Sequence, residues 1–268
     1  MGAWISTWTD DPAERALPVL LCLPPAGAGC QQFRSWQPAL AGTAQVYGVQ
    51  LPGRENRWRE PMPETFDEAV EAIAAQLRDI VADGRPLIVF GHSFGGLLGY
   101  EVARRVPPRA LVVSGCRAPG HWDGAGRGIV DNGEELDKLF DTADLDPRLL
   151  DEDTRALMVA MLRKDAQLSL SYVHKPGVRL GMPVHAWGAD GDETVSSRDL
   201  AGWAAVTTAA FTRHTTTGGH HAVLRRPQPV LDQLTALLRG AGADSPRRHP
   251  HHDRRLTDRP TRLTDRPA

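Results

Sequence analysis

Residues 86–98 have the sequence PLIVFGHSFGGLL. The first five residues are an apolar run typical of a strand buried on both faces, and Leu97–Val106 is a predicted helix. Between them, Gly91–Gly95 matches the G-x-S-x-G pattern, in which a serine lies on a sharp turn from strand to helix. Because such a turn exposes the hydroxyl and strains the backbone, the stretch predicts Ser93 as a nucleophile. The alternative is a glycine-rich turn with an incidental serine.

The same turn predicts part of an oxyanion hole. The glycines are required because the neighbouring strand and helix leave no room for Cβ atoms. The N–H of Phe94 points to where a carbonyl oxygen would become negative, at the positive end of the helix. Such folds take a second donor from the loop after an early strand. That loop is Pro24–Gly27, after the apolar run Leu17–Leu23, and its candidate donor is the N–H of Ala26. Its alternative role is a tight turn.

A serine hydroxyl needs a base that is held by an acid. In folds that carry the nucleophile on such a turn from strand to helix, the chain order is Ser, Asp or Glu, then His. Three acids follow the predicted strand Val184–Gly188: Asp190, Asp192 and Glu193. We favour Asp192, because its spacing to Val195 is usual for this turn. Asp190 is the second choice, and a surface turn acid is the alternative for all three.

The predicted base is His220, where the glycines of Thr217–His221 let a loop fold over the nucleophile. His221 is the alternative base. We interpret His214 as a residue on a strand surface. The remaining histidines of the central region have no matching context and receive no catalytic role: His92, His121, His174 and His185.

Predicted strands and helices alternate up to about residue 117. The strand-like runs are residues 17–23, 45–49, 86–90 and 110–113, and the pattern returns at 183–188 and 209–214. Helices are predicted through Trp36 and Leu40, after Thr65, and over 229–238. The alternation predicts a mostly parallel sheet with helices on both faces, an α/β fold.

The clearest helix carries its apolar residues on one face. These residues are Phe66, Val70, Ile73, Leu77 and Ile80. Thr65 is the predicted N-cap, Glu68 completes a capping box, and Gly84 ends the helix.

Residues from about 119 to 180 interrupt the alternation. Gly- and Asp-rich turns over 121–133 lead into helical patterns at 136–140 and 154–172. We interpret the segment as an insertion of helices between two strands of the sheet. If it has a function, we expect it to act as a lid. The chain therefore divides into an α/β domain over residues 1–243 and a tail over residues 244–268.

The tail is rich in Arg, Pro and His and is predicted to be disordered. It contains RLTDRP twice. Its histidines, His249, His251 and His252, favour adventitious metal binding over a physiological metal site.

The 268-residue chain has 31 Lys and Arg against 33 Asp and Glu, a formal net charge of −2. This balance argues against a nucleic-acid partner bound by bulk electrostatics. No run reaches the roughly 18 apolar residues of a membrane helix, and the N-terminus lacks the pattern of a secretion signal. Cys22, Cys30 and Cys116 have no paired spacing, which is typical of a reducing compartment. We expect a cytoplasmic protein with no membrane partner.

Several separated motifs carry a family resemblance. They are LLCLPPAGAG (20–29), FRSW (33–36), VYGVQLPGRENR (46–57), VFGHSFGG (89–96), LRKDAQLSLSY (162–172), AWGADGDETV (186–195) and GGHHAVL (218–224). Over about residues 17–240 the chain resembles α/β-hydrolases, specifically the type II (editing) thioesterases of polyketide and non-ribosomal peptide assembly lines. PGRENR is the most telling motif. Pro25 and Ala28 depart from the His-Ala-Gly-Gly that is common in the family.

The resemblance implies an α/β-hydrolase fold with a helical lid and hydrolysis of an acyl thioester on the phosphopantetheine arm of a carrier protein. It implies that Ser93, His220 and Asp192 act as nucleophile, base and orienting acid. No metal or organic cofactor is required. We hypothesise that Met158, Met161, Leu162 and Leu168 in the lid set the acyl length, although core packing explains such residues more often.

Three alternatives share some of these features. A chain-releasing thioesterase uses the same triad, and a general carboxylesterase also cleaves oxygen esters. A non-catalytic carrier-binding protein on the same fold is disfavoured, because a retired site has no physical reason to keep all three residues.

Overall fold

The computed structural model describes residues 2–122, 127, 130 and 151–243. Its strands form one sheet in the order β1-β3-β2-β4-β5-β6-β7, in which β1 is antiparallel to β3 and the other neighbours are parallel. The strands are β1 Ile5–Thr7, β2 Val19–Leu23, β3 Gln45–Val49, β4 Leu87–His92, β5 Ala110–Ser114, β6 Val184–Ala189 and β7 Phe211–Thr216. The central strand β4 is the one that ends at the Ser93 turn.

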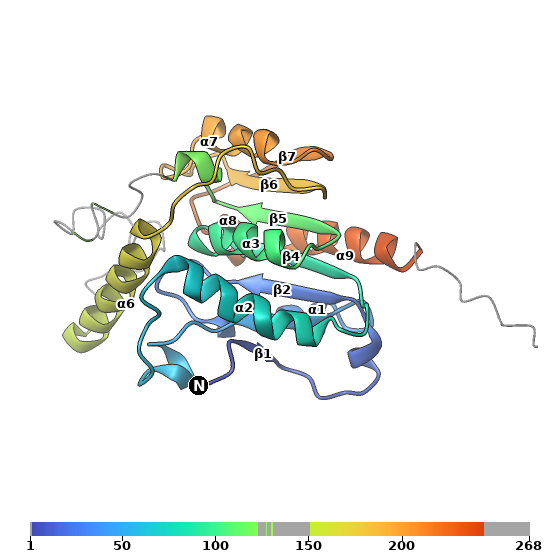
Figure 1. The fold of residues 1–268 in the computed structure, drawn as a ribbon, viewed down its shortest axis with the longest axis horizontal. Coiled ribbons are helices and arrows are strands. Elements are labelled where there is room, and N and C mark those ends of the chain that lie inside the picture. The colour runs from blue at the N-terminus through green and yellow to red at the C-terminus, as the bar shows by residue number, and fades with distance from the viewer. Residues whose placement is uncertain (1, 123–126, 128–129, 131–150, 244–268) are drawn as a thin grey trace, which may run out of the picture.

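Helices cover both faces of the sheet (Figure 1). The α-helices are α1 Trp36–Ala39, α2 Phe66–Ile80, α3 Phe94–Arg105, α6 Glu152–Leu170, α7 Ser197–Ala201, α8 Ala222–Arg225 and α9 Gln228–Ala243. The 3-10 helices are η1 Glu14–Ala16, η2 Cys30–Phe33, η3 Glu55–Arg57, η4 Pro119–His121 and η6 Gly202–Val206. The predicted mostly parallel α/β sheet is confirmed.

Alternate side chains of the central strands enter two apolar clusters. In β2, Leu21 and Leu23 face the cluster beneath α2 and α3, whereas Leu20 and Cys22 face the cluster beneath α1 and α9. All these side chains are fully buried. A strand that is apolar at every position is therefore explained by helices on both of its sides.

The start of α2 differs in one detail from the prediction. Thr65 is the N-cap, and its Oγ1 accepts from the N–H of Glu68 at 3.2 Å. The Glu68 carboxylate accepts from the N–H of Glu64, not from that of Thr65. The predicted reciprocal capping box is therefore wrong, because the carboxylate reaches one residue further back. The predicted apolar face is buried, with Ile80 at its edge only partly so.

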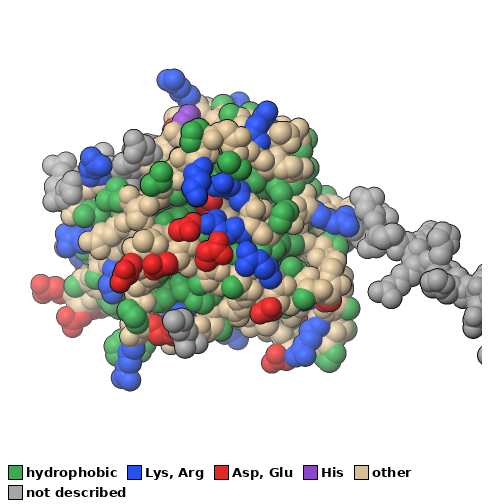
Figure 2. Space-filling model, in the orientation of Figure 1, with side chains coloured by type: hydrophobic (Ala, Val, Ile, Leu, Met, Phe, Trp, Pro, Cys, Tyr) green, Lys and Arg blue, Asp and Glu red, His purple; other side chains and the backbone are tan. Residues whose placement is uncertain are grey.

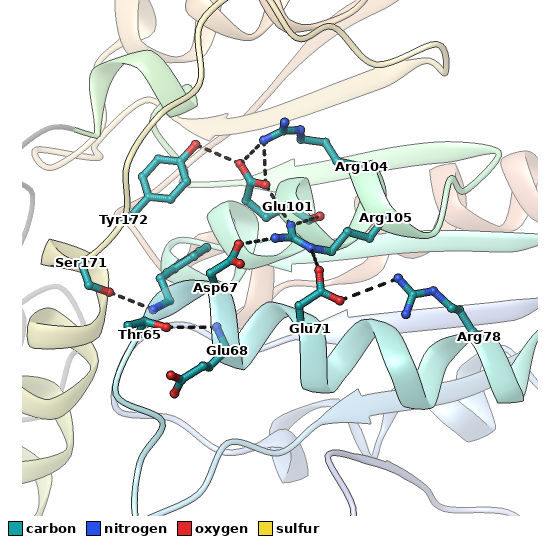
Figure 3. Close-up of polar contacts among 11 residues, drawn as sticks. Thr65, Asp67, Glu68, Glu71, Arg78, Glu101, Arg104, Arg105, Ser171 and Tyr172 are labelled. Carbon is teal, nitrogen blue, oxygen red and sulfur yellow. Dashed lines mark hydrogen bonds and ion pairs between the residues drawn. The ribbon is translucent and has the colours of Figure 1, made fainter.

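The outer face of α2 and α3 carries charges of both signs, intermixed in Figure 2. Figure 3 shows the network that some of these charges form: Arg105 lies among Asp67, Glu71 and Glu101, and Glu101 also binds Arg104 and Tyr172. The mixture agrees with the near-neutral net charge of the chain.

The interruption of the alternation lies between β5 and β6. Within it, the helix α6 stands beyond the carboxyl ends of the strands (Figure 1). The helix predicted at 136–140, the tail over 244–268 and its three histidines lie outside the described residues. None of the helices described is both long and apolar enough to cross a bilayer.

Candidate active site

Ser93 lies between the last residue of β4 and the first residue of α3. Its backbone has φ 52° and ψ −122°, and among the described residues only Glu55 is another non-glycine with positive φ. Such a conformation costs about 1–3 kcal/mol and persists only where its surroundings enforce it. One enforcing contact is the N–H of Ser93, which donates to Ser114 O on β5 at 2.8 Å.

The glycines of the turn allow strand and helix to meet. A Cβ at Gly91 would overlap the carbonyl oxygen of Gly95, and a Cβ at Gly95 would overlap the carbonyl oxygens of Leu23 and Pro24. The prediction that crowding requires glycine at these positions is confirmed. The turn therefore packs directly on the end of β2, beside the loop that contains Ala26.

Asp192 and His220 form a buried pair. Asp192 lies in the turn after β6, and His220 lies in the loop between β7 and α8. Asp192 Oδ2 is 2.8 Å from His220 Nδ1, and the two side chains are 1% and 4% exposed. A ring nitrogen so close to a carboxylate carries the proton, which leaves the lone pair that a general base needs on Nε2.

Thr194 supports both members of this pair. Its Oγ1 donates to Asp192 Oδ1 at 2.7 Å and lies 2.8 Å from His220 Nδ1, and its N–H also donates to Asp192 Oδ1. Burial raises the pKa of Asp192, but the His220 ring and the bonds from Thr194 outweigh burial and hold that pKa below its ordinary value. Sequence reasoning missed Thr194. Its signal is the D-x-T spacing, at which an aspartate commonly binds the residue two positions on.

The alternative acids lie elsewhere. Asp190 is exposed, and its Oδ1 accepts from the N–H of Gly218 at 2.8 Å, so it binds the histidine loop through the backbone. Glu193 is exposed. The structure brings the Asp192 carboxylate to the His220 ring, whereas the Asp190 carboxylate binds only the backbone of the histidine loop.

His220 lies against His92, the residue before Ser93 in the chain. The ring centroids of His92 and His220 are 5.0 Å apart. A Cβ at Gly115, next to Ser114, would lie 3.0 Å from Cε1 of each ring. Within the described chain no direct hydrogen bond joins Ser93 Oγ to His220. Catalytic hydrogen bonds are often longer before substrate binds, so this geometry is compatible with general-base catalysis.

His92 and His221 are further imidazoles at this site. His92 is fully buried, its Nδ1 is 3.2 Å from Ser114 Oγ, and its Nε2 has no hydrogen-bond partner among the residues that the structure describes. Its ring centroid is 5.1 Å from that of His221. Burial, then the charge of His220, lowers the pKa of His92 well below its ordinary value and that of His221 to about 4. Sequence analysis gave His92 no role, although its place beside the nucleophile was the available signal.

The loop after β2 offers one clear candidate for the second oxyanion donor. Pro24 and Pro25 have no N–H, the N–H of Gly27 donates to Asp165 Oδ2 at 2.7 Å, and that of Ala28 donates to Pro25 O at 3.2 Å. Within residues 24–28, this leaves Ala26. The other predicted donor, Phe94, is the first residue of α3, where helix N–H groups lack intrahelical acceptors.

Two motifs that carried the family resemblance, but for which the sequence predicted no structural role, meet at this loop. Arg54, from PGRENR, and Asp165, from LRKDAQLSLSY, form a bidentate ion pair with N–O distances of 2.5 and 2.7 Å. Sequence reasoning missed the contact, because the motifs lie 111 residues apart.

The predicted acyl-length residues divide into two groups. Leu168 is buried in the core, and Leu162 lies so close to Gly27 that a Cβ there would be 2.8 Å from Leu162 Cδ2. Met158 and Met161 precede Leu162 on α6 and are half-buried. Only Leu162 among these four is shown in contact with the loop of the site.

In the described part of the chain, neither a thiol nucleophile nor a metal site offers an alternative to Ser93. Cys22, Cys30 and Cys116 are buried, and burial raises the pKa of Cys30 to about 12. Such a thiol is a poor nucleophile at neutral pH. No group of three or more His, Cys, Asp or Glu among the described residues could hold a metal ion.

Comparison with known proteins gives consistent relatives. The family model "Thioesterase domain" matches residues 18–238. Thioesterase PikA5 of Streptomyces venezuelae is 31% identical over 90% of this chain and 94% of its own length. The type II thioesterase BorB from the borrelidin biosynthetic cluster is 30% identical, with a TM-score of 0.75 over 88% of this chain and 98% of that one. The RedJ thioesterase from the prodiginine pathway of Streptomyces coelicolor is 33% identical, with a TM-score of 0.74 over 85% of this chain and 87% of that one.

Proposed function

The chain belongs to the thioesterase domain family, and from this membership we propose that it is an editing thioesterase of polyketide or non-ribosomal peptide biosynthesis. Its substrate is an acyl group held as a thioester on the phosphopantetheine arm of a carrier protein. The observation that carries the proposal is the strained Ser93 turn beside a buried Asp192–His220 pair, in a chain that aligns with type II thioesterases along most of their length.

In the first half of the proposed reaction, Ser93 Oγ attacks the thioester carbonyl carbon while His220 Nε2 takes its proton. Asp192 keeps the imidazole oriented and stabilises its cation. The tetrahedral intermediate then collapses, the C–S bond breaks, and His220 returns the proton to the departing phosphopantetheine sulfur. The product is an acyl ester on Ser93 and a free carrier thiol.

In the second half, His220 takes a proton from water, and the water oxygen attacks the ester carbonyl. Collapse breaks the bond to Ser93 Oγ, which takes the proton back from His220, and releases the carboxylic acid. In both halves the N–H groups of Ala26 and Phe94 stabilise the oxyanion. Losing one such donor costs about 3 kcal/mol of transition-state stabilisation.

The remaining expectations from the sequence fit this scheme. We propose that residues 1–243 form one hydrolase domain, in which about 119–180 acts as a lid past which the phosphopantetheine arm reaches Ser93. We also propose a cytoplasmic location, which suits three buried free cysteines and a partner that carries a thiol.

The test is release of short acyl groups from a loaded carrier protein. Wild type should release them, whereas Ser93→Ala and His220→Ala should lose most activity, and His221→Ala should keep more than His220→Ala. Asp192→Asn should cost far more than the paired control Asp190→Asn. Release that survives His220→Ala but not His221→Ala would overturn the base assignment.

A parallel assay with a nitrophenyl ester separates the proposal from a general carboxylesterase. The proposal requires a higher rate on the acyl carrier protein. A clear preference for the oxygen ester would contradict the thioesterase role, even with the triad intact.

A further inference from the structure

The pair formed by Arg54 and Asp165 lies deeper than the other Arg–carboxylate pairs of the described residues. Its side chains are 1% and 0% exposed. Every other such pair has one partner at least 17% exposed, as in Arg104 with Glu101. Replacing a buried ion pair by apolar side chains is often neutral or stabilising. Stability alone therefore gives no reason for two charges at this position.

The contacts of the pair point to the loop after β2. Asp165 Oδ2 accepts from the N–H of Gly27 at 2.7 Å, and Arg54 donates to the carbonyl oxygen of Ala28 at 3.2 Å. The pair thus holds the loop through a donor and an acceptor of its backbone, on the side that follows Ala26.

Residues 25–28 form a turn whose conformation depends on this contact. The N–H of Ala28 donates to Pro25 O, and Gly27 has φ +77°, which is the value for the third residue of a type II turn. A type I turn differs by rotation of the central peptide, between Ala26 and Gly27. Rotation would turn the N–H of Gly27 away from Asp165 and present the carbonyl oxygen of Ala26 to the carboxylate. The Asp165 contact therefore selects type II.

The helix that carries Asp165 is fixed near its C-terminal end. Ser171 Oγ, just after α6, accepts from the N–H of Phe66, and the Tyr172 hydroxyl donates to Glu101 (Figure 3). In contrast, residues 152–157 at the start of α6 are exposed. Asp165 thus belongs to the anchored part of α6.

We propose that Arg54 and Asp165 are positioning residues: by fixing the Ala26–Gly27 peptide and the backbone of residues 27 and 28, they hold Ala26 in place, so that its N–H, which belongs to the preceding peptide, faces the oxyanion. This inference rests on the proposed function, because it assigns the purpose of the turn to stabilisation of the oxyanion at Ser93. Arg54 orients the Asp165 carboxylate through two hydrogen bonds, and Asp165 holds the central peptide of the turn.

The test compares two double variants that both remove the ion pair. R54M/D165N keeps a side-chain oxygen that can accept from Gly27, whereas R54M/D165L does not. For R54M/D165L we expect kcat to fall about 10- to 100-fold, with KM within about threefold of wild type. For R54M/D165N we expect kcat at least about fivefold above that of the Leu double.

A second readout separates positioning from folding. An alkylboronic acid forms a tetrahedral adduct on the serine, and its inhibition constant should rise in the Leu double by about the factor lost in kcat/KM. R85M, which removes a partly buried arginine from its pair with Asp83, is the control and should keep wild-type kcat even where its melting temperature falls. If the Leu double does not fold, the single variants D165N and D165L are compared by the same ratio.

Equal kcat in the Asn and Leu variants, or unchanged boronate affinity in the Leu variant, would overturn the positioning role. The kinetics are measured on an acyl carrier protein and on a nitrophenyl ester. A wild type inactive on the carrier substrate contradicts the proposed function alone, and the comparison of variants then proceeds on the ester. A wild type inactive on both contradicts the proposed function and, with it, the role of the pair.

Discussion

The two proposed oxyanion donors are held in place by different means. Phe94 is fixed by the turn in which it occurs, because β4, the strained Ser93 and α3 are contiguous. Ala26 is fixed from outside its loop, and the contact of Gly27 with Asp165 spans 138 residues. Both must serve one carbonyl oxygen, for which an error of about 1 Å can cost 100-fold in rate. Local sequence therefore builds one half of the site, and the tertiary fold builds the other.

Gly95→Ala tests the contact between the Ser93 turn and the end of β2, from which the Ala26 loop begins, and should have the largest effect. The new Cβ would overlap the carbonyl oxygens of Leu23 and Pro24, which are backbone atoms and cannot rotate away. We expect a loss of at least about 3 kcal/mol in the free energy of unfolding and more than about 100-fold in kcat/KM. Gly240→Ala, with open space around the site of its Cβ, is the control and should be neutral or slightly stabilising. Equal tolerance of both changes would show that the contact between turn and loop is not needed.

His221→Gln tests how the imidazole of His92, beside the nucleophile, interacts with those of the later histidine loop. Burial and the charge of His220 lower the pKa of His221 to about 4, against 6.5 in the unfolded chain. The unfolded state therefore binds more protons below pH 6.5, so this stabilisation is complete above pH 6.5 and is lost as the pH falls toward 4. Wild type should lose about 2 kcal/mol from this residue between pH 7 and pH 5.

The measurement is urea denaturation of wild type and His221→Gln at both pH values. The variant should lose about 2 kcal/mol less than wild type on acidification. His92 is present in both proteins, and burial is the main cause of its lowered pKa, so only the smaller part that His221 causes differs between them. An identical loss would mean that His221 is not held neutral by its packing against His92 and His220.

Thr194→Val tests how the Thr194 hydroxyl, in the turn after β6, supports the Asp192–His220 pair. The change removes the hydroxyl that binds Asp192 and His220, while the backbone bonds to Asp192 remain. We expect kcat to fall about 10-fold with little change in KM, because the imidazole loses part of its orientation. Thr212→Val, at an exposed position of β7, is the matched control. Wild-type kcat in Thr194→Val would show that Asp192 alone orients the ring.

Sequence reasoning succeeded where the information is contiguous. The apolar runs predicted the six parallel strands, and the glycines around Ser93 predicted the crowding that the structure shows. It missed β1, because three residues at a sheet edge carry too little pattern. It also missed His92, Thr194 and the Arg54–Asp165 pair, whose roles depend on neighbours from other elements. The predicted capping box failed for a similar reason, since the path of the chain before Thr65 decides which N–H the Glu68 carboxylate reaches.

The most direct test of the central claim is to trap the acyl-enzyme. Wild type is mixed with an acyl carrier protein, quenched in acid within milliseconds, digested and examined by mass spectrometry. The account predicts the mass of the acyl group on the peptide that contains Ser93, and no adduct in Ser93→Ala. An acyl group on another residue, or turnover that continues in Ser93→Ala, would contradict it.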